Sequence, residues 1–146
     1  GMKKLSHTAI ILISLTSASC SDMRFGAEQI AECEQGYIHS LKSPSSYKII
    51  ESEAFVTTDS VDKISQDFKI AGNSLATNEN GMASLMYVRI EYDADNSYGA
   101  SIRNEEFCHF TKNTSGKWEQ AFRDYSAEIE QLEADAIDGV KRSLGN

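Results

Sequence analysis

The 146-residue chain contains a single proline, three cysteines and no cluster of lysine or arginine residues. Its 22 acidic side chains outnumber the 14 basic ones. A protein that binds nucleic acid, or an anionic lipid surface through its own charges, presents a basic patch. We therefore exclude nucleic acid as a partner, and we exclude a polybasic contact with anionic lipid.

The sequence also lacks the short motifs that place catalytic side chains together. It has no G-x-S-x-G turn, no glycine-rich phosphate loop and no H-E-x-x-H zinc motif. No cofactor is therefore predicted. An active site assembled from scattered residues leaves no linear motif, so an enzyme stays an open alternative.

The first residues have the pattern of an export signal. Gly1, ahead of Met2, is typical of a residue left by cloning. Lys3 and Lys4 are followed by an apolar run over residues 9–15, which is far too short to cross a bilayer. Small residues then lead directly to a cysteine. This order predicts a tag residue and signal peptide over residues 1–19.

The sequence Ser17-Ala18-Ser19-Cys20 resembles the lipobox of bacterial lipoproteins, with Ser17 where that family usually has leucine. The resemblance implies that the Cys20 thiol carries a diacylglycerol, with residues 20–27 as a lipidated tether. Ser21 after the cysteine implies an outer-membrane protein that faces the periplasm. The alternative is plain secretion with an unmodified Cys20, which would leave an exported chain with an odd thiol.

Residues 28–146 are predicted to form one α+β domain. Periodicity and turn signals indicate a first helix, a first strand with a slip at Ile49 and Ile50, a possible short helix capped by Ser60, three further strands and a last helix. The expected spans are 28–41, 47–57, 61–68, 85–92, 100–111 and 117–123, with the last helix beginning after Asp124 or Ser126.

The expected architecture is an antiparallel sheet of about four strands, with the N-terminal and C-terminal helices packed on one face. Alternation over 85–92 places Val88 and its even-numbered neighbours on the core face. The last helix carries one apolar stripe, and its packing against the sheet would bury that stripe. The stripe consists of Tyr125, Ile129, Leu132, Ala136, Val140 and Leu144.

Cys33 and Cys108 are predicted to form a disulfide. Cys33 lies on the apolar side of the first helix, and Cys108 lies on an inward position of a strand. Export would place the pair in an oxidising compartment. The alternatives are two buried thiols, or a catalytic Cys108 beside His109. Adjacent strand residues point to opposite faces, which argues against the catalytic pair.

The turn after residue 92 is a possible recognition loop, formed by Asp93, Asp95, Asn96 and Tyr98. Residues 92–100, with Ile102-Arg103 and Cys108, resemble a stretch found in small exported bacterial proteins of unknown activity. A calcium loop is an alternative, but Tyr98 and Asn104 stand where the EF-hand pattern needs glycine and glutamate. Tyr98 could instead pack over the hairpin end.

No metal site is predicted, because the two candidate ligands His39 and His109 lie on different elements with no ligand spacing. The leading hypothesis is a non-enzymatic binding or interaction module in the bacterial envelope. It would be anchored to the membrane by lipid, with another envelope protein as a candidate partner. The alternative is a small-ligand carrier or a hydrolase-type enzyme. A deep cavity with converging polar groups would favour the alternative, and an exposed apolar surface would favour protein partners.

Overall fold

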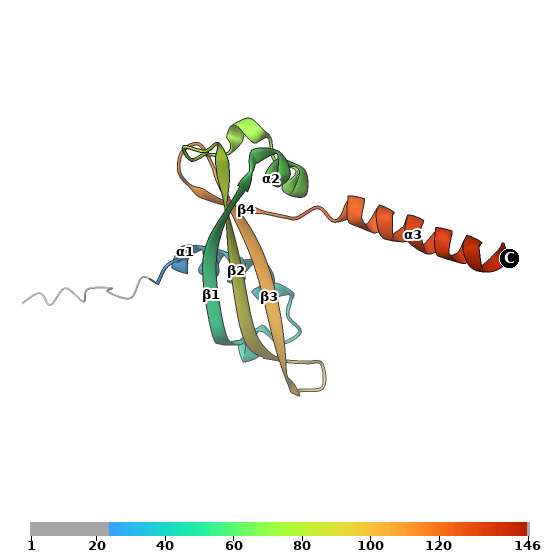
Figure 1. Cartoon of the computed structure of the whole chain (residues 1–146). Helices are drawn as coiled ribbons and strands as arrows, with labels where there is room; N and C mark the ends of the chain where they lie inside the picture. Colours follow the sequence, from blue (N-terminus) through green and yellow to red (C-terminus); the bar gives the residue numbers. More distant parts are fainter. Residues whose placement is uncertain (1–23, 146) are drawn as a thin grey trace, which may run out of the picture.

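The computed structural model describes residues 24–145, so the predicted signal peptide and Cys20 lie outside the described residues. One antiparallel sheet of four strands runs in the order β1-β2-β3-β4 (Figure 1). The predicted α+β class is confirmed. Its elements are α1 (Ala27–Tyr37), β1 (Lys48–Ser60), α2 (Val61–Phe68), β2 (Met82–Asp95), β3 (Ser101–Lys112), β4 (Trp118–Ala121) and α3 (Ser126–Leu144).

Strands β1 and β2 form a long ribbon in which Ala54 pairs with Val88 and Ser60 pairs with Met82. The register shifts between Ile49 and Glu51, which leaves Ile50 as the extra residue. The slip predicted at these isoleucines is therefore a β-bulge, which adds local twist to a long edge strand.

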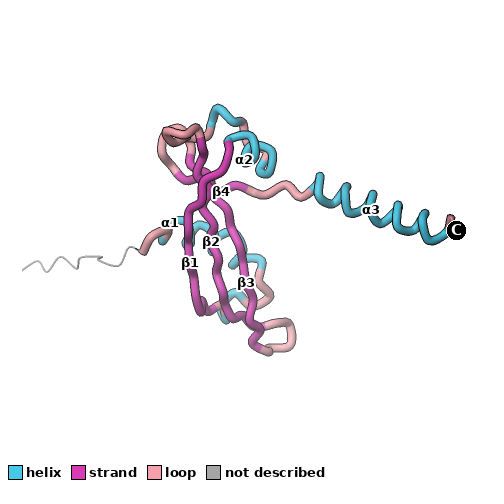
Figure 2. Tube along the Cα trace, in the orientation of Figure 1, coloured by secondary structure: helices cyan, strands magenta, loops and turns pink. Residues whose placement is uncertain are grey.

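The sheet supports one hydrophobic core on each face. Alternation along β2 turns Met86, Val88, Ile90 and Tyr92 toward the face that α1 covers, as predicted. Nearer the start of the strand, Leu85 points to the opposite face, where α2 packs. Figure 2 shows the two helices at different heights along the sheet. Two small cores therefore share one strand, each with its own helix.

Local signals explain where the helices begin. The predicted cap of α2 is confirmed, because Ser60 Oγ accepts a hydrogen bond from the Lys63 N–H at 3.2 Å. Before α1, Gly26 has a φ of 76°, and a Cβ there would lie 2.4 Å from the Cβ of Ala54. Only glycine suits a position that is both left-handed and this close to a neighbouring strand.

The predicted disulfide is confirmed. Cys33 on α1 and Cys108 on β3 are bonded, with their Cα atoms 5.9 Å apart. That separation is ordinary for a disulfide, so neither element has to move to form it. The bond fastens α1 to the third strand across the core.

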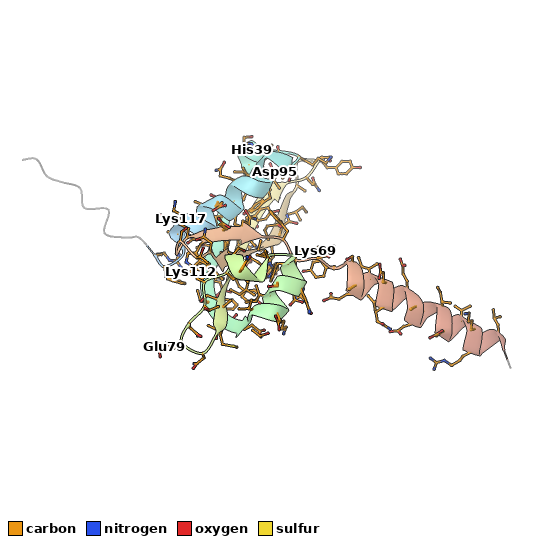
Figure 3. All side chains as sticks on the ribbon, turned by 90° about the horizontal axis from the view of Figure 1, so that it is seen from above. His39, Lys69, Glu79, Asp95, Lys112 and Lys117 are labelled. Carbon is orange, nitrogen blue, oxygen red and sulfur yellow. A yellow bond between two sulfur atoms is a disulfide. The ribbon has the colours of Figure 1, made fainter. Side chains whose placement is uncertain are left out.

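The expected packing of the C-terminal helix is wrong. None of the described residues of α3 is buried, and the helix extends away from the sheet (Figures 1 and 3). The chain leaves β4 toward α2, where the Asp124 N–H donates to the Asp67 carbonyl at 2.7 Å. The Asp124 carboxylate also pairs with Lys69. These contacts start α3 beyond the edge of the sheet.

Within residues 24–145, no helix has the length and apolar character that crossing a membrane requires.

Candidate interaction site at the open edge of β3

Strand β4 is shorter than the predicted span of 117–123. It runs from Trp118 to Ala121 and pairs with β3 only over His109–Lys112. No described strand pairs with Ser101–Cys108 on that side of β3. Two thirds of β3 is therefore an open sheet edge.

The direction of the backbone groups along this edge follows from the two flanking turns. The Asn96 N–H donates to the Ala100 carbonyl, and the Asn113 N–H donates to the Lys117 carbonyl. Pairing alternates along an antiparallel ladder, so even-numbered residues of β3 bond to β2. Ser101, Arg103, Glu105 and Phe107 therefore turn their N–H and C=O groups to the open side.

Ion pairs between β2 and β3 fix the positions of charged side chains along this edge. Arg103 Nε donates to Asp93 Oδ1 at 3.0 Å, and Arg89 Nη2 donates to Glu105 Oε1 at 2.7 Å. The Asp93 carboxyl has a lowered pKa, because Arg103 stabilises its charge through a hydrogen bond. These pairs order the open strand and leave its outward backbone groups accessible.

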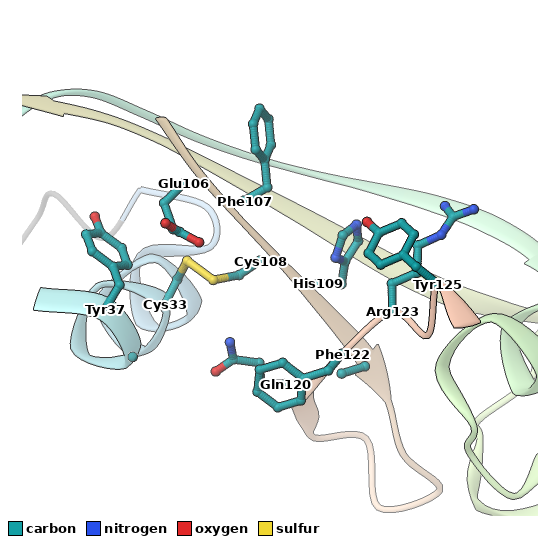
Figure 4. Close-up of a pocket in the computed structure, with 12 residues that line it drawn as sticks. Cys33, Tyr37, Glu106, Phe107, Cys108, His109, Gln120, Phe122, Arg123 and Tyr125 are labelled. Atoms are coloured by element: carbon teal, nitrogen blue, oxygen red, sulfur yellow. A yellow bond between two sulfur atoms is a disulfide. The ribbon is translucent and has the colours of Figure 1, made fainter. Parts of the chain in front are cut away.

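A cavity of about 370 Å³ opens at the point where β4 ends (Figure 4). Residues of α1, β3, β4 and the segment before α3 line it. Phe107, Phe122 and Tyr125 are exposed aromatic residues at the cavity, and Glu106, His109, Gln120 and Arg123 contribute polar groups. The open edge of β3 therefore ends at a cavity that aromatic side chains partly line.

Glu106 and His109, two titratable residues that line the cavity, do not face each other. Figure 4 shows Glu106 and His109 on opposite sides of the β3 ribbon. Burial raises the pKa of the Glu106 carboxyl. Burial also lowers the pKa of His109, and the charge of Arg123 lowers it further. The His109 ring packs on Tyr87, with ring centroids 4.9 Å apart, so we assign it to packing.

Among the described residues that line the cavity, Arg123 carries a buried side-chain nitrogen that has no hydrogen-bond partner. Its Nη2 donates to Glu128 Oε1 at 2.8 Å, and its guanidinium carbon lies 5.4 Å from the centroid of the Tyr125 ring. Its Nε is buried without an acceptor in the structure. A ligand or partner carbonyl at the cavity could satisfy this donor.

The predicted recognition loop is largely a structural turn. Asn96 Oδ1 accepts hydrogen bonds from the N–H groups of Tyr98 and Ala100, at 2.9 and 3.0 Å, and Asp93 is held by Arg103. The Asp95 N–H donates to Ser46 Oγ at 2.8 Å. Tyr98 is 94% exposed at the tip, so the expectation that it packs over the hairpin end is wrong.

Among residues 24–145, no group of three histidine, cysteine or acidic side chains is placed to hold a metal ion. Cys108 is bonded to Cys33, which removes it as a nucleophile. Sequence reasoning missed the cavity residues Phe107, Phe122 and Arg123, because they meet only through the early end of β4. A comparison with protein-family models, with curated proteins and with solved structures gave no match to this chain.

Proposed function

We propose that this protein is a lipid-anchored envelope module that binds an extended segment of another protein. The segment adds as a further strand to the open edge of β3. The observation that carries this proposal is the unpaired stretch Ser101–Cys108, which continues directly into the aromatic cavity. Strand addition to a sheet edge gains affinity from main-chain hydrogen bonds and specificity from neighbouring side-chain pockets.

The residues along the open edge of β3 indicate which side chains the bound segment would carry. Four outward residues, from Ser101 to Phe107, offer alternating donors and acceptors to an antiparallel strand. Arg103 and Glu105 carry opposite charges on one face, which favours an acidic residue opposite the first and a basic residue opposite the second. Phe107 and Phe122 at the cavity favour an apolar side chain at the end of the segment that lies there.

The envelope part of the proposal rests on the leader and on the disulfide. The order of residues from Lys3 to Cys20 resembles a lipoprotein signal, and the resemblance implies outer-membrane sorting from Ser21 after the cysteine. The Cys33–Cys108 bond supports an oxidising compartment such as the periplasm. A lipid anchor on Cys20, with residues 20–27 as the tether, would hold the binding edge close to its membrane.

A small-ligand carrier is the second candidate, and the buried Nε of Arg123 favours it. A carboxylate in the cavity would accept a hydrogen bond from this group. Against this candidate, Glu106 and His109 do not converge on a common point in the cavity. The unpaired N–H and C=O groups on the open side of β3 would also have no role in a small-ligand carrier.

A proline at Glu105 tests strand addition. Proline removes an N–H that faces the open side, and edge strands tolerate this. We expect Glu105→Pro to keep the melting temperature within a few degrees but to lose binding to peptides selected on the full chain from a displayed random-peptide library. Glu105→Ala is the matched control, since it changes the same side chain and keeps the N–H. Equal peptide binding by Glu105→Pro and Glu105→Ala would contradict strand addition, and binding lost only in Arg123→Gln would favour the carrier.

The anchor is tested separately, by mass spectrometry of protein made in a bacterial host with its leader. We expect an acylated Cys20 at the mature N-terminus, and we expect Cys20→Ser to move the protein from the membrane fraction to the soluble fraction. An unmodified Cys20, or a Cys20→Ser chain that stays with membranes, would remove the anchor from the proposal. Neither result would affect the peptide experiment.

A further inference from the structure

Helix α3 presents an apolar stripe that nothing in the described chain covers. Leu132 is 68% exposed and Leu144 is 80% exposed, and the remaining apolar residues of the stripe are at least half exposed or small. Most helical stability in proteins comes from packing an amphipathic face against another surface, and less from helix propensity. We therefore expect the 19-residue helix α3 to pack its apolar stripe on a partner surface.

We propose that the partner is α3 of a second copy, paired in the antiparallel direction. The charges along the helix favour this arrangement. Its acidic residues come first and its basic residues come last: Glu128, Glu130, Glu133, Asp135 and Asp138 precede Lys141 and Arg142. Antiparallel pairing places the acidic part of each helix beside the basic last turn of the other. Parallel pairing would place the acidic parts together.

The side chains of the stripe fit a two-fold axis at Ala136. With the axis there, Leu132 of one copy lies beside Val140 of the other, and the small side chain of Ala136 lets the two helices approach closely. Lys141 then lies at the level of Glu130 and Glu133 of the second copy. Antiparallel helices also place each positive dipole end beside a negative one.

A membrane surface is a poorer partner for the stripe. Helices that lie on membranes carry lysine and arginine on the polar face, which attracts anionic lipid. The polar face of α3 holds five acidic and two basic side chains. Its net negative charge therefore favours a protein surface with a basic end, which a second α3 supplies.

The pairing would give the protein two binding edges. Helix α3 has 19 residues and is roughly 28 Å long. In each copy, residues 122–125 link the sheet to the first turn of this helix. In an antiparallel pair the two sheets lie at opposite ends, so the β3 edge of each copy stays open. The inference does not depend on what those edges bind.

Sedimentation velocity of the full chain tests the pairing, with Cys20→Ser in the background to remove lipid and the odd thiol. We expect a concentration-dependent dimer. Leu132→Asp should weaken it by about tenfold or more, and its neighbour Gln131→Asp on the polar face should leave the dissociation constant within about twofold. Both changes add one charge at adjacent positions, and neither residue is buried, so each variant keeps the fold of the sheet.

Orientation is tested by disulfide trapping between separately made Leu132→Cys and Val140→Cys chains. We expect the mixture to cross-link as 132–140 pairs, and Leu132→Cys alone to cross-link poorly. A monomer at every concentration would overturn the inference, as would a dimer that Leu132→Asp leaves unchanged. Efficient 132–132 cross-links would overturn the antiparallel direction. A dimer broken by Glu105→Pro and not by Leu132→Asp would place the contact at the β3 edge and also overturn it.

Discussion

The sheet with α1 and α2 differs from α3 in how each region is held. In the first region, β2 is enclosed by two cores, and a disulfide joins α1 to β3. In the second region, a long amphipathic helix has no buried residue. Both regions have clear apolar periodicity in the sequence. Periodicity therefore predicts that a face will be covered, but does not identify the surface that covers it.

The joint between the two regions is small. It consists of the segment from Phe122 to Tyr125. Asp124 in this segment bonds through its N–H to the Asp67 carbonyl of α2, and its carboxylate pairs with Lys69, the residue after α2. Few contacts cross this joint, so we expect the sheet region and α3 to respond independently to substitution.

Val88→Asp should unfold the sheet region, whereas Leu132→Asp should change its stability by less than about 0.5 kcal/mol. Val88 of β2 is 1% exposed in the core on the α1 face of the sheet. An unpaired carboxylate there costs several kcal/mol, which is comparable to the whole stability of a small domain. Trp118 in β4 is the single tryptophan, so its fluorescence during urea denaturation reports the sheet region. Equal midpoints for Val88→Asp and the parent would contradict the observed register.

Cys33→Ala or Cys108→Ala should each lower the free energy of unfolding by about 2–5 kcal/mol. The double variant should cost no more than either single one, since each removes the same bond. Thiol titration of denatured, unreduced protein should find neither cysteine free. Two free thiols in protein matured in the periplasm, or a fully additive double variant, would show that the bond does not form in solution.

Local signals in the sequence predicted much of the sheet region. The alternation of 85–92, the Ser60 cap and the inward positions of Cys33 and Cys108 depend on the residues themselves and on the regular geometry of strands and helices. These features are therefore readable before any tertiary contact is known.

The candidate site was not predictable in the same way. The strand expected over 117–123 ends at Ala121, because the Asp124 N–H bonds to Asp67 and draws the chain toward α2. That contact links residues far apart in the sequence, and it decides where β4 ends and in which direction α3 begins. The cavity likewise joins α1 residues to the end of β4, and no spacing along the chain encodes that meeting.

Glu91→Lys should destabilise the sheet region by about 1 kcal/mol, more at low salt than at high salt. The Glu91 side chain is 19% exposed and lies between Arg89, at 3.1 Å, and Arg103, at 3.5 Å, so a lysine there meets two like charges. Glu53→Lys is the matched control on β1, because that side chain is 52% exposed and lies 3.6 Å from Arg89. Equal urea midpoints for the two variants would show that solvent fully screens the charges of Arg89 and Arg103 at Glu91.

Protonation of Asp124 should loosen the joint without unfolding the sheet region. The Lys69 ammonium and the Ser126 N–H both donate to this carboxylate, and they lower its pKa to about 2. A carboxyl whose pKa is lower in the folded chain stabilises the fold above its unfolded value of 3.8, and this contribution is lost as the pH falls toward 2. We expect a carbon-detected NMR titration to give a pKa near 2 for Asp124, and Lys69→Ala to raise that pKa toward 3.8.

The exchange of backbone amides separates the joint from the sheet in that experiment. Between pH 4 and pH 2, the Asp124 and Ser126 amides should lose protection in the parent, and the Val88 amide should keep it. In Asp124→Asn the same two amides should be weakly protected at both pH values, because the asparagine side chain has no charge for Lys69 to pair with. Loss of protection at Val88 together with Ser126 would mean that the two regions unfold as one unit, and the independence inferred from their few shared contacts would then be wrong.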